Sequence, residues 1–195
     1  MLIKGTDVIG KPVISKLNGE KIDSVQDLIY DSHQNKVRAL LIDSGGWFGE
    51  AKVILVENVS SFGKDAVVVE NSNVVHKAGE VDGEVASIAK ENNTITQTKI
   101  ITEEGTELGK VSDLMFDPGT GMVESLVVSQ GVKNLTSGKK LVNVSDIVTI
   151  GKDATIVSKF TEEALKLQDN TQGVMGKVNE MKERLDRKST RLKEC

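Results

Sequence analysis

The sequence predicts an all-β protein with two tandem small β-barrels, followed by an α-helical C-terminal extension. Three observations lead to this fold class. A segment of about 65 residues occurs twice, each occurrence contains several short stretches rich in β-branched residues, and a helical pattern begins after residue 160. The predicted boundaries are 1–72 for the first barrel, 73–95 for a connector, 96–160 for the second barrel and 161–195 for the extension.

The repeat appears as a constant offset of 86 residues. Aligning residues 19–42 with 105–128 gives seven identities in 24 positions. Further on the offset becomes 88, because "GKDA" recurs at 63–66 and 151–154, and a two-residue insertion within 130–140 explains the change. Upstream, "KPVISKLNGEKI" aligns with "QTKIITEEGTEL". We call the two segments the first and the second repeat.

Each repeat has the pattern of β-strands. "VQDLIYD" and "VSDLMFD" alternate apolar and polar residues, whereas "KVRALLID" and "MVESLVVS" become continuously apolar. Between them lie "DSHQNK" and "DPGTGM", and Pro118 with its neighbouring glycines marks a turn. Five or six short strands favour a barrel closed on itself, which leaves no exposed edge. The residues expected at equivalent buried places are Val25, Leu28, Tyr30 and Leu40, and Val111, Leu114, Phe116 and Leu126.

The connector and the extension are the helical parts. Residues 79–92 are expected to hold a short helix within a partly ordered connector. In the extension, Thr161 is the expected N-terminal cap of a helix. Further apolar residues follow heptad spacing: Val174, Val178, Met181, Leu185 and Leu192. This narrow stripe disfavours a membrane-surface helix and leaves two alternatives open, pairing with a partner helix and docking on the barrels.

These segments resemble the PRC-barrel domain, named for the H subunit of the photosynthetic reaction centre and also found in a ribosome maturation factor. The resemblance rests on "GTDVIGKPVISKLNGEKIDSVQDLIYD" and "TKIITEEGTELGKVSDLMFD", and on the closing segments "LVNVSDIVTIGKDATIV" and "ILVENVSSFGKDAVVV". Asp23 stands where the family pattern has glycine. The resemblance implies binding, docking or assembly, and it implies no shared catalytic apparatus.

Composition excludes several classes of function. The net charge of −4 argues against a protein that binds nucleic acid through its phosphate backbone. Cys195 is the only cysteine, so no intramolecular disulfide can form and a cytoplasmic location is expected. The first ten residues have no apolar run typical of a signal peptide, and no stretch has the length of a transmembrane helix.

Candidate catalytic and metal-binding residues are scarce. His33 and His76 are the only histidines, and neither has metal-ligand spacing to another histidine or to Cys195. We therefore expect no catalytic residue, no metal and no cofactor. The recurring pairs Asp27 with Asp113 and Asp31 with Asp117 are expected to cap turns by accepting backbone N–H bonds.

"SGGWFGE", residues 44–50, is the most distinctive local stretch. Its adjacent Trp47 and Phe48 either form an exposed contact for a partner or plug the end of a barrel. With Val178, Met181 and Leu185 of the extension, they are the candidate partner contacts. The function expected first is a non-enzymatic scaffold that docks a protein partner or a second copy. The alternative is a small-molecule or cofactor-binding protein that uses a groove between the barrels, and an enzyme is the least favoured class.

Overall fold

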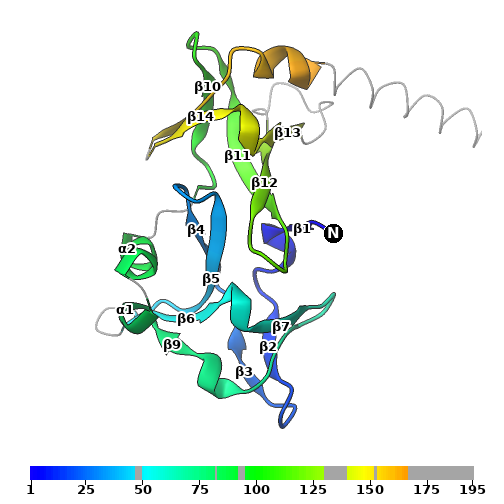
Figure 1. The fold of residues 1–195 in the computed structure, drawn as a ribbon, viewed down its shortest axis with the longest axis vertical. Helices are drawn as coiled ribbons and strands as arrows, with labels where there is room; N and C mark the ends of the chain where they lie inside the picture. Colours follow the sequence, from blue (N-terminus) through cyan, green and yellow to red (C-terminus); the bar gives the residue numbers. More distant parts are fainter. Residues whose placement is uncertain (47–49, 82, 92–94, 130–139, 152, 167–195) are drawn as a thin grey trace, which may run out of the picture.

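The computed structural model describes residues 1–46, 50–81, 83–91, 95–129, 140–151 and 153–166, and the statements below refer to this part of the chain. The protein is built mostly of β-strands, which confirms this part of the predicted fold class. In Figure 1 the second repeat occupies the top of the molecule and much of the first repeat lies at the bottom. The β4–β5 and β11–β12 hairpins lie between them.

The first repeat forms two sheets. Their orders are β3-β2-β8-β7 and β4-β5-β6-β9, in which only β2 and β8 pair in parallel. The strands are Pro12–Ser15 (β2), Lys21–Ser24 (β3), Asp27–Asp31 (β4), Lys36–Asp43 (β5), Lys52–Leu55 (β6), Val59–Phe62 (β7), Val67–Val69 (β8) and His76–Lys77 (β9). Single 3-10 turns are Gly5–Asp7 (η1), Val56–Asn58 (η2) and Ser72–Val74 (η3).

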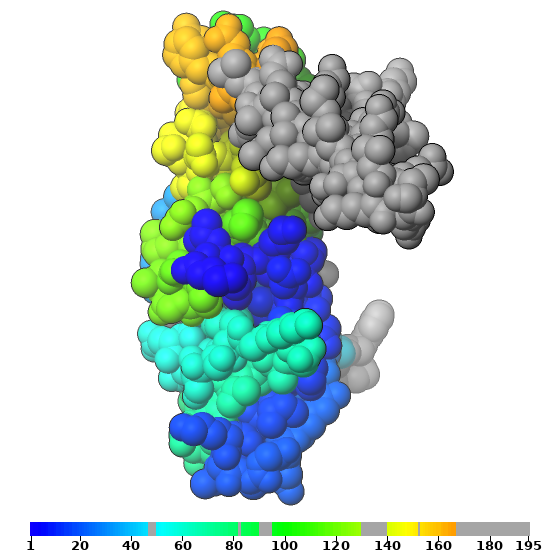
Figure 2. All heavy atoms as spheres, turned by 90° about the vertical axis from the view of Figure 1, so that its right-hand side faces the viewer, coloured from blue at the N-terminus to red at the C-terminus, as the bar shows by residue number. Residues whose placement is uncertain are grey.

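The second repeat forms one sheet of order β13-β12-β11-β10-β15-β14. The strands are Lys99–Thr102 (β10), Glu107–Phe116 (β11), Val123–Ser129 (β12), Lys140–Asn143 (β13), Ile147–Ile150 (β14) and Ala154–Val157 (β15), with a 3-10 turn at Val144–Asp146 (η4). An N-terminal strand, Ile3–Lys4 (β1), pairs antiparallel with β11. In Figure 2 the dark blue N-terminal residues accordingly lie against the green of the second repeat.

Strand registers confirm the repeat. Leu28 lies opposite Leu40, as Leu114 lies opposite Leu126. The "GKDA" turn closes in the same way in both repeats, with N···O distances of 2.9 Å. The upstream alignment was wrong by one residue, because Val13 faces Asp23 as Ile100 faces Gly109. The first repeat has one extra residue in the turn after β2.

No sheet in the described part of the chain closes into a barrel, so the predicted closed barrels are wrong. In the second repeat, η4 leads from one end strand of the sheet, β13, to the other, β14, and no ladder joins these two strands. The 3-10 turn carries the chain round a corner instead. Side-chain packing holds the ends together, since Val142 of β13 lies in the main core cluster and Ile147 of β14 packs against the same cluster.

Gly109 explains why the second repeat has one sheet where the first has two. Its φ is +142°, and a Cβ added there would lie 2.5 Å from the carbonyl oxygen of Ser129. This close approach lets β11 run unbroken beside β12. At the equivalent position, Asp23 has a side chain, and the first repeat splits two residues further on, at Val25 and Gln26, into β3 and β4.

The two repeats share one hydrophobic core. The cluster contains β-branched, leucine and aromatic side chains from both repeats, among them Val13, Tyr30, Leu40, Ile54, Val67, Ile100, Leu114, Phe116, Leu126 and Val157. The expected equivalent burial is confirmed, except that Leu28 is only half-buried and packs against this cluster. The repeats therefore bury their apolar faces in common.

The connector holds two short helices, Ala78–Val81 (α1) and Gly83–Glu91 (α2), so the expected helix is confirmed. They cover the outer face of β4, β5 and β6, where Val85 packs in a second, smaller core with Ile29 and Leu41. No helix in the described residues is long and apolar enough to cross a membrane.

The extension is described only to residue 166, and residues 161–166 are helical. Leu165 of this helix is buried in the main core. The predicted cap is wrong, because the buried Thr161 hydroxyl has no hydrogen-bond partner. The first helical bond instead joins the Ala164 N–H to the Phe160 carbonyl, so the turn begins one residue earlier.

Candidate functional site: the seam between the repeats

The predicted partner contacts lie outside the described residues. This holds for Trp47 and Phe48, and for Val178, Met181 and Leu185 of the extension. The structure does describe the residues that lead into the aromatic stretch. Gly45 and Gly46 have φ of +76° and +55°, and the Asp43 carboxylate accepts the Gly45 N–H at 2.9 Å. That bond, together with Lys52, holds the pKa of Asp43 below its usual value.

Neither histidine belongs to a metal site within the described part of the chain, where no group of three or more metal-ligating side chains occurs. His33 is exposed in the turn after β4, and His76 lies in β9. Cys195 lies outside the described residues.

The Asp31 and Asp117 pair caps two equivalent turns, as predicted. The Asp31 Oδ1 accepts the N–H groups of His33 and Gln34. The Asp117 Oδ1 accepts those of Gly119 and Thr120. These bonds lower the pKa of Asp117, with the Thr120 amide as the largest cause. Both aspartates thus fix the turns of the β4–β5 and β11–β12 hairpins.

Asp27 and Asp113 lie within strands, and Asp27 caps no turn, so the prediction is wrong for Asp27. Asp113 does accept an N–H of a turn, that of Thr6 in η1. Each Oδ1 accepts the N–H of the next residue, at 2.8 Å. Asp113 also accepts both the N–H and the hydroxyl of Thr6, which ties the N-terminal segment to the second repeat. Burial raises the pKa of Asp27, and its bond from Leu28 only partly opposes this.

Replacing Asp27 with asparagine is expected to raise the melting temperature at neutral pH. Because the pKa of Asp27 is raised in the folded protein, the native state holds this proton more tightly than the unfolded chain. The wild type therefore loses stability as pH rises from 3.8, the ordinary value, through the raised value. Thermal melts across this range should show the advantage of Asp27→Asn appear with rising pH and disappear well below 3.8.

Asp117→Asn serves as a control in which the change in stability at neutral pH has the opposite sign, because the pKa of Asp117 is lowered. Its stabilising contribution is present at neutral pH and is lost as pH falls. The asparagine variant should be the less stable one at pH 7 and should match the wild type in acid. A melting temperature of Asp27→Asn below that of the wild type at neutral pH would contradict the expected cost of burying this carboxylate.

The two repeats meet at a seam with approximate two-fold symmetry. Val37 donates its N–H to the Gly121 carbonyl, and Val123 donates its N–H to the Asn35 carbonyl, both at 2.8 Å. The two bonds are equivalent, because Val123 lies 86 residues after Val37 and Gly121 lies 86 residues after Asn35, with donor and acceptor in exchanged repeats. Between them, Lys36 forms an isolated antiparallel β-bridge with Met122, the equivalent residue of the second repeat. Asn35 and Gly121 both have positive φ, +49° and +77°. The sequence signal for this contact was the occurrence of asparagine and glycine, the residues that most readily adopt positive φ, at equivalent turn positions 35 and 121.

Side chains lock the seam. Phe62 of the first repeat packs edge to face on Phe116 of the second, with ring centroids 5.8 Å apart. Gly5 fits between the equivalent Leu28 and Leu114, and a Cβ added to it would lie 3.1 Å from the Leu28 side chain. The hydrogen bonds and the common core make the two repeats one body.

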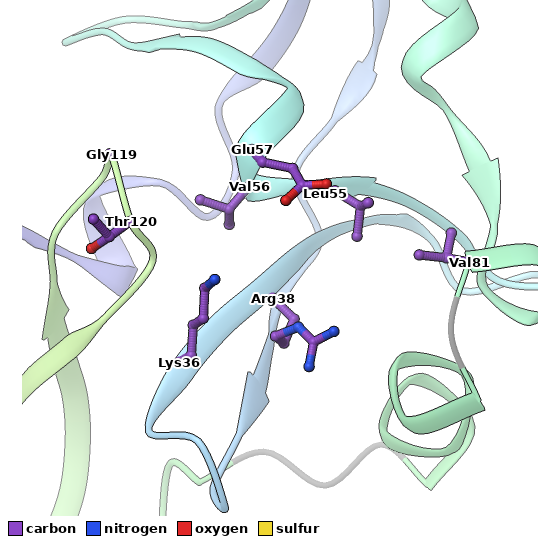
Figure 3. Close-up of a pocket in the computed structure, with 8 residues that line it drawn as sticks. All are labelled: Lys36, Arg38, Leu55, Val56, Glu57, Val81, Gly119 and Thr120. Atoms are coloured by element: carbon purple, nitrogen blue, oxygen red, sulfur yellow. The ribbon is translucent and has the colours of Figure 1, made fainter.

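One side of the seam holds a pocket of about 420 Å³. Figure 3 shows Lys36 of β5 between the Gly119–Thr120 turn of the second repeat and Arg38, whose guanidinium points away from that turn, toward the side of Val81. The remaining lining residues are Leu55, Val56, Glu57 and Val81. Arg38 is fixed by an ion pair of 3.2 Å with Asp31, whose side chain is fully buried.

The class of protein that this fold defines is a β-rich tandem repeat with a small pocket between its halves. The chain belongs to the PRC-barrel domain family, because the family model matches residues 1–76 and 89–164. A search of curated proteins found no match.

Proposed function

We propose that this protein is a non-enzymatic docking or scaffold protein that acts on a protein partner or on a second copy of itself. Two matches to the PRC-barrel domain carry the proposal, since this family indicates protein interaction in general terms. The common core supports it, because a rigid body presents binding loops with little loss of conformational entropy. A cytoplasmic location forms part of the proposal.

The proposed contacts are Trp47 and Phe48 on one loop and Val178, Met181 and Leu185 on the extension. Aromatic side chains dominate interface energetics, and an apolar heptad stripe is stabilised by a partner surface. Two glycines with positive φ begin the aromatic loop and Asp43 anchors it, so its first residues have a defined path.

Replacing Met181 and Leu185 together with aspartate should abolish self-association and leave the melting temperature unchanged. Two charges in an apolar stripe cannot be buried without a large cost. Light scattering of the full chain measures the mass, with Trp47→Ala/Phe48→Ala as the parallel variant for the loop. A dimer that survives both double variants would exclude these contacts as the association surface.

Deleting residues 173–195 should leave the remaining chain folded, because neither repeat includes them. The expected result is an unchanged near-ultraviolet circular dichroism spectrum and a single cooperative melt. If the shortened chain fails to fold, residues 173–195 belong to the core as Leu165 does, and the extension is not a separate unit.

A second function, binding of a small molecule between the repeats, is favoured by the pocket at the seam. Its volume of about 420 Å³ falls within the range of small-ligand sites. Native mass spectrometry of the purified protein, followed by denaturation, tests this function. A retained mass released on unfolding supports it.

A further inference from the structure

We propose that the pocket at the seam binds a small organic or inorganic anion, a carboxylate or a phosphate, through the Lys36 ammonium group. This inference rests on the second proposed function and names its ligand class. It is argued from Lys36, from Arg38 and from the equivalent site on the other side of the seam.

Lys36 is the cation at this pocket for which the described part of the chain offers no ion-pair partner. Its side chain is half-buried, and within the described residues its ammonium makes no ion pair or hydrogen bond. The stem lies over Gly121, where an added Cβ would be 3.4 Å from the Lys36 Cγ and Cε. A partly desolvated ammonium held at the wall of a pocket attracts an anion more strongly than a freely solvated one.

Arg38 reaches the same pocket because of a β-bulge. Ile29 faces Ala39 and Tyr30 faces Val37, so Arg38 is the extra residue of β5. Bulges redirect side chains and recur next to binding sites. The ion pair with buried Asp31 offsets the charge of Arg38 and holds it in place, so Arg38 shapes the site and Lys36 supplies the net positive charge.

The equivalent place in the second repeat carries neither of these cations. Met122 stands where the first repeat has Lys36, and Glu124 stands where it has Arg38, in the same bulge. The backbone has the same bulge at both places, and it makes the same hydrogen bonds across the seam. The seam therefore does not require a charge at Lys36, whereas Arg38 neutralises the buried Asp31. Together the two cations give one side of the seam a basic character that the other lacks.

The other wall restricts where the ligand binds. The N–H groups of Gly119 and Thr120 already donate to Asp117, so they do not bind the anion. Their turn forms the wall of the pocket opposite Lys36, which binds the anion. Glu57 is exposed at the pocket, where solvent screens its charge. An anion that places one carboxylate or phosphate group at Lys36 fits this arrangement.

The experiment is a titration of the full chain followed by amide nuclear magnetic resonance. The probes are inorganic phosphate, succinate and the neutral succinamide. We expect saturable shifts at the amides of Lys36, Arg38, Gly119 and Thr120 with either anion, and none with succinamide. Lys36→Met should weaken phosphate binding by about tenfold or more, because it removes a charge-assisted bond worth roughly 1.5–3 kcal/mol.

Lys36→Met keeps the fold, since methionine occupies the equivalent position 122. The matched control is Lys21→Met, which removes an exposed lysine on β3, and its affinity should equal that of the wild type. Equal binding of succinamide and succinate would overturn the anion assignment and leave the second proposed function standing. Unchanged phosphate affinity in Lys36→Met, or no shift at the seam with any probe, would overturn the site.

Discussion

Replacing Phe116 with alanine is expected to lower the free energy of unfolding by about 3–5 kcal/mol. The Phe116 side chain is fully buried and packs edge to face on Phe62 of the other repeat. Its removal leaves a cavity where the two repeats meet, and β-strands on both sides prevent the site from collapsing. Calorimetry should show a fall in melting temperature of roughly 6–20 °C for a chain of this size.

The same measurement tests whether the repeats unfold together. Because Phe116 lies in a core common to both, we expect one cooperative transition in the wild type and one, shifted downwards, in the variant. Ile54→Ala, a fully buried change in the first repeat, should move that same transition. Leu17→Ala removes an exposed side chain of similar size, and it should change stability by less than about 0.5 kcal/mol. Two separate transitions, only one of them shifted by Phe116→Ala, would contradict a shared core.

Local chemistry made the repeat and its strands predictable. Alternation in "VQDLIYD" and "VSDLMFD", and turn residues such as Pro118, act within a few residues, so sequence alone reveals them. The alignment of β2 with β10, the equivalent strands at the start of the two repeats, was harder to predict. Val13-Ile14 and Ile100-Ile101 are both apolar pairs, so hydrophobicity fits either of two neighbouring alignments, and only pairing with the next strand distinguishes them.

The open sheets and the seam were not predictable, because they depend on contacts between residues far apart in the chain. Closure of a barrel requires a ladder between its end strands, and η2 and η4 turn the chain before such a ladder forms. Likewise, the sequence alone predicts Lys36 to be an ordinary surface lysine that follows a turn. Only its bridge to Met122 places it beside a pocket formed with the second repeat.

Replacing Gly109 with alanine is also expected to have a large effect, lowering the free energy of unfolding by about 2–4 kcal/mol. The φ of +142° is unfavourable for any residue with a side chain, and the added Cβ would lie 2.5 Å from the Ser129 carbonyl oxygen. Relief requires β11 and β12 to separate at this point. Hydrogen exchange should therefore become faster at the amides of Lys110 and Val111, beside the break, in addition to a lower melting temperature.

Asp23→Ala is the matched control, at the equivalent position of the first repeat. Asp23 is exposed, and its carboxylate only accepts the Ser24 N–H, at 2.7 Å. Since β3 and β4 already lie in separate sheets, alanine there should cost no more than about 1 kcal/mol. Equal effects of the two alanine substitutions would mean that Gly109 does not hold β11 and β12 together, and that the single sheet of the second repeat has another cause.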